Sequence, residues 1–261
     1  MRPTPVIEDI LSTPALWRGR QHVAHDGRRV ISSGWPVLDA LLPGGGWPLG
    51  SLIEVGIAAP GSGECALFFP LWRNRATPAK NAVATNTVTA KGRIATRASA
   101  RNASATSIPA IALIDPPFLP YAPGWLHAGI ALSRIWWISA SSERQRLWAA
   151  EQSLRSGVCA AVLLWPQNID ANALRRLQLA AESAATLGLC FRHENELSQP
   201  SHAPIRLHLQ PQGNQWNIEL IKCRGRTGGA KCTIARAPPS ARTAPRDSAI
   251  DLHSRAPRDI G

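Results

Sequence analysis

A stretch that could hold a phosphate group lies near residue 60. The phosphate-binding pattern G-x-x-x-x-G-K-[ST] uses backbone N–H groups, a lysine and a hydroxyl to hold nucleotide phosphates and Mg²⁺. The matching register here reads Ala58-Ala59-Pro60-Gly61-Ser62-Gly63-Glu64-Cys65. Glu64 stands in place of the lysine and Cys65 in place of the hydroxyl. Because a carboxylate at about 4 Å repels a phosphate by roughly several kcal/mol, the pattern predicts a loop that has lost ATP hydrolysis.

A strand before this loop and a helix after it are expected to position it. Leu52–Val55 is typical of a short buried strand. The apolar stretch from Gly63 to Arg75 predicts a helix that opens at the glycines and is kinked or shortened by Pro70. Gly44 to Gly46 are expected to supply positive φ in a turn, with ligand binding as the alternative.

The rest of the chain alternates between apolar runs and helical patterns. Four runs are apolar throughout: Ala110–Ile114, Ile135–Ile138, Val158–Leu164 and Leu187–Phe191. Helices are expected after Ser142, where Gln145 completes a capping box, and after Asp170. The second helix has Leu174, Leu177, Ala181 and Ala184 on its apolar face and Arg175, Arg176 and Gln178 on the other. This alternation predicts an α/β fold with a mostly parallel sheet and helices on both faces.

Two later segments alternate apolar with polar residues, which is typical of strands with one solvated face. They are Ile205–Leu209 and Trp216–Lys222, separated by the turn residues Pro211 to Asn214. The spacing predicts an antiparallel hairpin at the C-terminal end of the sheet.

Composition divides the chain into an N-terminal segment (1–28), one α/β domain (29–226) and a tail (227–261). Residues 77–108 lack aromatic residues, and we expect a disordered insert there. The tail is rich in Ala, Pro, Arg and Ser and is also expected to be disordered. Most of the net charge of +12 comes from the insert and from residues 222–261, so the core is close to neutral.

The five cysteines are scattered and odd in number, with no C-x-x-C pair. They are expected to be buried thiols in a reducing cytoplasm rather than disulfides or zinc ligands. The histidines occur singly, so no metal site is predicted. No apolar run of about 18 residues or secretory leader is present in the sequence, which argues against a membrane or exported location.

The segment Ile31-Ser-Ser-Gly…Leu38-Asp39, followed by the glycine turn and the strand before the loop, resembles RecA-type recombinases. The chain more specifically resembles the bacterial ImuA family, which is associated with translesion DNA synthesis and is also described as RecA-like or SulA-like. The segments that carry this resemblance lie between residues 16 and 226: Leu16-Trp17-Arg18, Pro43–Gly50, Pro60–Glu64, Leu119–Pro123, Leu154–Gly157 and Leu174–Ala181. The insert at 77–108 and the tail depart from the family pattern.

The resemblance implies a RecA-like domain in an SOS-induced complex that copies damaged DNA. Its partners would be an ImuB-type inactive Y-family polymerase and an error-prone DnaE-type polymerase, with RecA as a further candidate. RecA-type ATPases also need two acids beyond the phosphate loop. Asp115 is present, but Pro117 falls where the catalytic glutamate is expected and Trp165 where the Mg²⁺-assisting aspartate is expected. We therefore predict a non-catalytic protein without a cofactor, and leave weak nucleotide binding without hydrolysis open.

Two surface clusters are candidate contact sites. Trp17 and Arg18, in a polar region, are the predicted partner contact. Lys222, Arg224 and Arg226 leave a sheet edge and could contact DNA phosphates, or could form a solvated charge run. Two other functions are kept as alternatives: a DNA-dependent ATPase that resembles a recombinase, and a SulA-like inhibitor of cell division.

Overall fold

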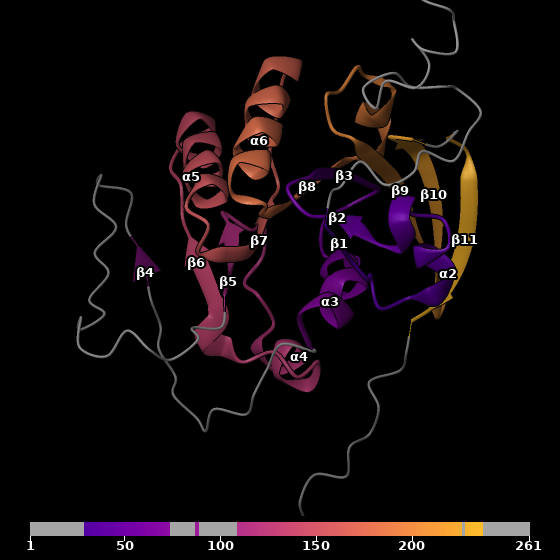
Figure 1. The fold of residues 1–261 in the computed structure, drawn as a ribbon. Coiled ribbons are helices and arrows are strands. Elements are labelled where there is room, and N and C mark those ends of the chain that lie inside the picture. The colour runs from indigo at the N-terminus through magenta and orange to yellow at the C-terminus, as the bar shows by residue number, and fades with distance from the viewer. Residues whose placement is uncertain (1–28, 74–86, 89–108, 226–227, 237–261) are drawn as a thin grey trace, which may run out of the picture.

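The computed structural model describes residues 29–73, 87–88, 109–225 and 228–236. Its centre is a nine-stranded sheet in the order β11-β10-β9-β3-β8-β7-β5-β6-β4 (Figure 1). The strands are β3 (Leu52–Ile57), β4 (Thr87–Val88), β5 (Ala110–Ile114), β6 (Ile135–Ile138), β7 (Cys159–Leu164), β8 (Leu187–His193), β9 (Ile205–Gln212), β10 (Gln215–Cys223) and β11 (Ala230–Ala235). A small second sheet pairs β1 (Val30–Ile31) with β2 (Trp47–Pro48).

The pairing confirms the mostly parallel sheet with an antiparallel C-terminal hairpin. All neighbouring pairs from β9 to β4 are parallel, and β9 and β10 are antiparallel and joined by a tight turn at Gly213 and Asn214. The runs that are apolar throughout form β5, β6, β7 and β8, and of these β5, β7 and β8 are buried on both faces.

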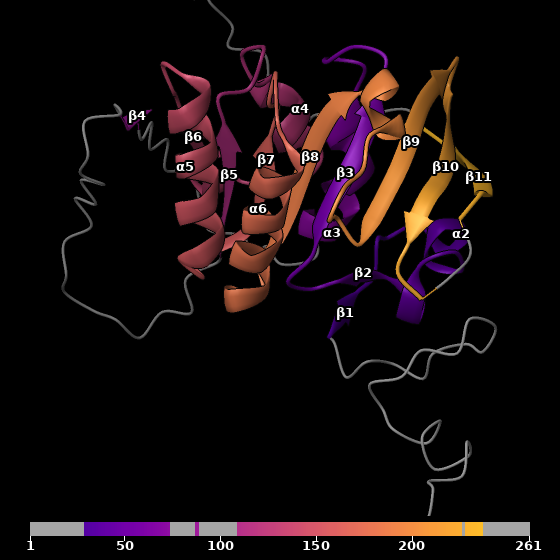
Figure 2. The same ribbon diagram turned by 90° about the horizontal axis from the view of Figure 1, so that it is seen from above.

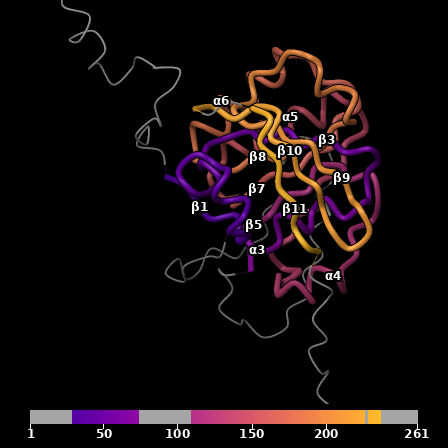
Figure 3. The backbone as a smooth tube through the Cα atoms, turned by 90° about the vertical axis from the view of Figure 1, so that its right-hand side faces the viewer, coloured from indigo at the N-terminus to yellow at the C-terminus, as the bar shows by residue number. Residues whose placement is uncertain are grey.

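The C-terminal boundary of the domain differs from the prediction. Residues 230–235 form β11, which pairs antiparallel with β10 and runs along the outside of the sheet (Figure 3). The expected end of the domain at 226 is therefore wrong, and β10 is not an edge strand. The sequence signal for a strand at 230–235 was weak, because Ile234 is the only large apolar residue that β11 buries. The part of the tail after Arg236 lies outside the described residues.

Helices cover both faces of the sheet, as predicted (Figure 2). One face is covered by α5 (Glu143–Arg155) and α6 (Ala171–Ala184). The other is covered by short elements: α2 (Pro36–Asp39), η1 (Pro43–Gly45), η2 (Glu64–Phe68), α3 (Phe69–Arg73), α4 (Ala122–His127) and η3 (Leu132–Arg134). A last turn, η4 (Glu194–Ser198), follows β8. The strands β3, β5, β7 and β8 send alternate side chains to the two cores, with Ile53 and Val55 in one and Leu52 in the other.

The predicted helix starts are confirmed. The Ser142 hydroxyl accepts the Gln145 N–H at 3.3 Å, and the Asp170 carboxylate accepts the Ala173 N–H at 2.6 Å. Gln178, in contrast, does not lie on a solvated face of α6. Its side chain is buried, accepts the Leu52 N–H at 2.8 Å and donates to the Gly50 carbonyl at 3.1 Å. The predicted placement of Gln178 on the polar face was wrong, because at four positions after Leu174 and three before Ala181 it belongs to the buried face of α6.

The segment after the glycine loop is two short helices rather than one. The chain forms the 3₁₀ turn η2 and then α3, with Pro70 as the second residue of α3, where a proline is tolerated. Pro70 also explains why position 34 is a glycine, because a Cβ there would lie 2.3 Å from the Pro70 Cβ. Gly44 and Gly45 have φ of 75° and 79° and confirm the predicted turn, whereas Gly46 is extended.

The other predicted segments are described only in part. Residues 1–28 lie outside the described residues, as does the 77–108 insert apart from Thr87–Val88, which pair with β6. None of the helices in the described part of the chain combines the length and apolar character needed to cross a bilayer.

Candidate functional site

The glycine loop lies at the carboxyl edge of the sheet. Residues 58–63 join β3 to η2, which confirms the expected strand–loop–helix order. Because β5, β7 and β8 run parallel to β3, the residues that follow these strands reach the same edge. A cleft of about 530 Å³ lies there, and Pro60, Asp115, Pro117, Trp165 and His193 are among its lining residues.

The Glu64 carboxylate folds back into the loop that would hold a phosphate. Both of its oxygens lie 3.1 Å from the Gly61 backbone nitrogen, and the side chain is only 4% exposed. Gly61 and Gly63 have φ of 84° and 90°, a conformation that glycine adopts without strain. A backbone N–H that could bind a phosphate oxygen is therefore already bound to a carboxylate of the same loop.

Trp165 completes the set of donors around Glu64. It follows β7, in the position predicted to have lost the Mg²⁺-assisting acid, and its indole Nε1 donates to Glu64 Oε1 at 3.2 Å. Its ring stacks on Phe191, with centroids 4.9 Å apart. The two departures from the ATPase pattern are therefore chemically linked, because the residue replacing the acid binds the residue replacing the lysine.

Asp115, the acid that the pattern retains, is committed to an ion pair. It has φ of 45° at the end of β5, a conformation that Asp tolerates better than most residues. Its Oδ2 accepts Arg146 Nε at 3.1 Å and Nη2 at 2.5 Å, and Arg146 also pairs with Glu143. Pro117, in the position expected for the catalytic glutamate, is an exposed wall residue of the cleft.

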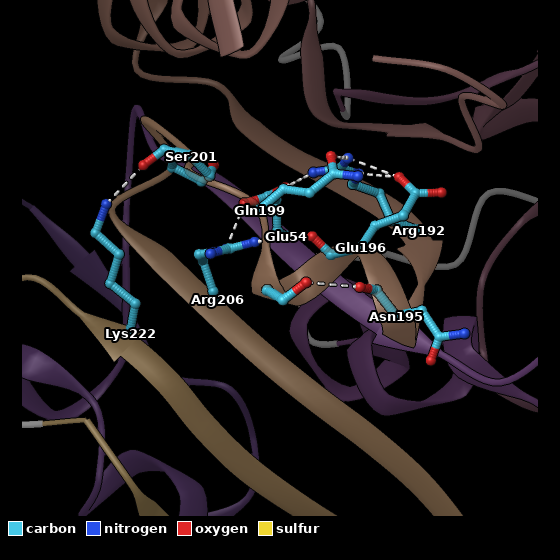
Figure 4. Close-up of polar contacts among 10 residues, drawn as sticks. Glu54, Arg192, Asn195, Glu196, Gln199, Ser201, Arg206 and Lys222 are labelled. Carbon is cyan, nitrogen blue, oxygen red and sulfur yellow. Dashed lines mark hydrogen bonds and ion pairs between the residues drawn. The ribbon is translucent and has the colours of Figure 1, made fainter. Parts of the chain in front are cut away.

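A buried charge network (Figure 4) reaches the wall of the cleft through Arg192 and Glu196. Glu54 in β3 is fully buried, 2.6 Å from Arg192 Nη1 in β8 and 2.8 Å from Arg206 Nε in β9. Arg192 also pairs with Glu196 of η4 at 2.6 Å and donates to Gln199. Burial lowers the pKa of Arg192, but its bonds to Glu54 and Glu196 outweigh burial, so the pKa is raised and the guanidinium stays charged.

Cys65 does not replace the hydroxyl that holds Mg²⁺ in the phosphate-binding pattern. Its pKa is raised well above the ordinary value, first by burial and then by the neighbouring charge of Glu64. The thiol therefore stays protonated near neutral pH and is a poor metal ligand. Within the described residues, no three His, Cys, Asp or Glu side chains cluster as metal ligands would.

Of the other predicted site residues, Ala58 lies at this edge, whereas Lys222 and Arg224 do not. Ala58 is exposed at the start of the loop. Lys222 donates to the Ser201 carbonyl at 2.9 Å, and its pKa is lowered by burial, with Arg206 and Arg224 adding repulsion (Figure 4). Lys222 and Arg224 lie at the opposite end of β10, beside the amino end of β3. Trp17, Arg18 and Arg226 lie outside the described residues.

Sequence reasoning missed the binding partners of Glu64 and the position of Arg236. The Arg236 guanidinium lies beside Gly63, where an added Cβ would be 2.7 Å from Nη2. Arg236 follows β11, in the segment expected to be disordered, so no local pattern placed it at the loop. The short apolar alternation of Cys232 and Ile234 was the only available signal.

Comparisons with known proteins identify the fold. No protein-family model and no curated protein matches this chain. The solved RadB recombinase has 15% identity and a TM-score of 0.53, with 78% of this chain and 95% of RadB covered. SulA from Pseudomonas aeruginosa has 20% identity and a TM-score of 0.35, with 54% of this chain and 95% of SulA covered. The RadB likeness shows a RecA-like fold, and the SulA likeness is too weak to support an argument.

Proposed function

We propose that this chain is a non-catalytic, RecA-like accessory protein that acts by contacting other proteins. The observation that carries the proposal is the position of Glu64, whose carboxylate occupies the Gly61 N–H and the Trp165 indole. For a phosphate to bind there, it would have to displace this carboxylate and then remain close to it. Both steps are unfavourable, because Glu64 would lose its donors and its charge would repel the phosphate.

The acids of the ATPase pattern support the same conclusion. Asp115 is held by Arg146, and Trp165 and Pro117 replace the two side chains that would assist Mg²⁺ and activate water. The protein keeps the RecA-like sheet and its surfaces, while the polar groups at the altered loop bind one another. Such a protein can act through its surface, as a scaffold or adaptor.

The biological process is proposed from the resemblance to the ImuA family. On that basis the protein serves SOS-induced translesion synthesis in the cytoplasm, together with an ImuB-type polymerase relative and a DnaE-type polymerase. RecA is a further candidate partner. The five free cysteines fit a reducing compartment.

ATP binding and hydrolysis by the purified protein test the catalytic part of the proposal. We expect no saturable binding of a fluorescent Mg²⁺–ATP analogue, and no phosphate release with or without single-stranded DNA. Saturable binding with DNA-stimulated phosphate release would instead support an ATPase. Glu64→Gln is the matched variant, because it removes the charge and nearly preserves the volume.

Two further experiments test the process. Immobilised protein should retain the ImuB-type polymerase or RecA, and retention of neither would remove the proposed partners. Deleting the gene should lower the damage-induced mutation frequency. Filamentous cells on overexpression, with an unchanged mutation frequency, would instead support an inhibitor of cell division.

A further inference from the structure

An exposed apolar loop lies next to the glycine loop. Between β5 and α4, Phe118 is 62% exposed and both Leu119 and Tyr121 are 74% exposed. Single exposed apolar residues are common, but three large ones within four positions are not needed to fill any core. They belong to a segment whose neighbouring prolines line the cleft: Pro116 and Pro117.

This loop is held in place on both sides. Phe118 lies against Gly61, where an added Cβ would be 3.1 Å from the ring. The loop then enters α4, whose Trp125 is buried and stacks on Trp72 with ring centroids 5.9 Å apart. Four prolines, at positions 116, 117, 120 and 123, restrict its backbone. The backbone that carries the exposed side chains therefore loses little conformational entropy on binding.

A cation lies beside the same glycine loop. Arg236 approaches Gly63, and its guanidinium lies 5.3 Å from the centre of the Trp216 ring. Among the residues that the structure describes, Arg236 has no carboxylate within ion-pair distance. Gly61 and Gly63 are two residues apart, at most about 7 Å, so Phe118 and Arg236 flank one short stretch of chain. The result is an apolar surface bordered by a positive charge that has no carboxylate partner in the described part of the chain.

We propose that Phe118, Leu119, Tyr121 and Arg236, named here the aromatic–arginine surface, bind a polypeptide segment of another protein. The segment carries a large apolar side chain beside a carboxylate. The apolar side chain packs on Leu119 and Tyr121, and the carboxylate pairs with Arg236, whose charge selects acidic over basic segments. This inference rests on the proposed function, because it assigns a surface to a protein that works by protein contacts.

The chemistry of the surface favours a polypeptide over a nucleic acid. Leu119 cannot stack with a base as an aromatic ring does, and binding along a phosphate backbone requires several cations. Arg236 is the only cation that the described contacts place at the glycine loop.

The test uses random peptides displayed on phage, selected on the full-length protein and then synthesised for affinity measurement. We expect enrichment of peptides with Asp or Glu next to Leu, Phe or Trp. The double variant Leu119→Ser with Tyr121→Ser should weaken the best peptide by at least about tenfold, because it removes the apolar anchors. Arg236→Gln should weaken it by about five- to tenfold, and should have no effect on the same peptide with its carboxylate changed to an amide.

The control is Leu179→Ser, which removes another half-exposed leucine from α6 on the opposite face of the sheet. It should leave the peptide affinity unchanged. If the double variant is not folded, as judged by circular dichroism, Leu119→Ser alone and Arg236→Gln carry the test.

Several results would overturn the proposal. These are the absence of any enriched peptide, peptides whose affinity is equal for all variants, and an oligothymidylate that binds the wild type but not the double variant. A dimer in sedimentation that the double variant abolishes would assign the surface to a second copy instead. ATP binding by the wild type would remove the proposed function but leave the peptide result standing, so the two failures are distinguishable.

Discussion

Two buried carboxylates ten positions apart are held in different ways. Glu54, within β3, is fully buried between the guanidinium groups of Arg192 and Arg206. Glu64, just after the glycine loop, is almost as buried but is held by the Gly61 N–H and the Trp165 indole. Among the described residues, no Lys, Arg or His lies within ion-pair distance of Glu64.

Because of this difference, we interpret Glu54 as a link between strands and Glu64 as a side chain that occupies the place of an anion. Glu54 joins three neighbouring strands by charge pairing, and such a network is costly to break on one side. Glu64 is bound as an external anion would be, by N–H groups that converge on its oxygens. In our interpretation, Glu64 occupies the place of a ligand, and Glu54 serves only the sheet.

The largest expected effect comes from removing a cation of the Glu54 network. Arg192→Ala should lower the free energy of unfolding by about 3–5 kcal/mol, because Glu54 would keep its buried charge with only Arg206 opposite. Urea denaturation measures the change. Arg155→Ala is the control, since it removes a half-exposed arginine from a pair with Glu151 at the surface and should cost at most about 1 kcal/mol. If both variants lowered the free energy of unfolding equally, the buried network would stabilise the fold no more than a surface ion pair does.

Removing the Glu64 side chain should cost less. Glu64→Ala leaves the Gly61 N–H and the Trp165 indole without their acceptor, which should lower the free energy of unfolding by about 1–3 kcal/mol. Amide hydrogen exchange should become faster at Gly61 and stay unchanged at Val162 in the middle of β7. Unchanged exchange at Gly61 would contradict the view that Glu64 fills the loop.

A smaller change is expected at Trp165. Trp165→Phe keeps an aromatic ring against Phe191 but removes one donor from the buried Glu64 carboxylate, at a cost of about 1 kcal/mol. A double-mutant cycle with Glu64→Ala isolates the bond, because the cost should nearly vanish when Glu64 is absent. Additive costs would mean that the indole and the carboxylate do not interact.

The smallest effect concerns the thiol next to Glu64. Glu64→Gln should lower the pKa of Cys65, because it removes the charge that adds to the effect of burial. A lower pKa gives more thiolate at pH 8, so iodoacetamide should alkylate Cys65 about two- to fivefold faster, as read by mass spectrometry. Cys159, whose pKa burial raises to about 11, is the internal control and should not change. A slower reaction at Cys65 would contradict the assignment of its pKa shift.

The local sequence determined most of the elements of this protein. Runs such as Ala110–Ile114 are short and apolar throughout, which is typical of a strand covered on both faces. Ser142 and Asp170 cap helices with their own side chains, which requires only neighbouring residues. The register of the glycine loop was predictable for the same reason, because a strand, two glycines and a helix follow one another directly.

Tertiary structure decided what binds what at the loop. Trp165 lies 101 positions after Glu64, and Arg236 reaches Gly63 from a strand expected to be disordered. The sequence showed that the lysine and the acids were replaced, but not that Glu64 and Trp165 would bind each other. The helical period places Gln178 on the buried face of α6, but the period could not show that Gln178 would bind the backbone of Gly50 and Leu52. Hydrogen bonds and ion pairs between distant residues depend on strand order, and side-chain periodicity carries no information about that order.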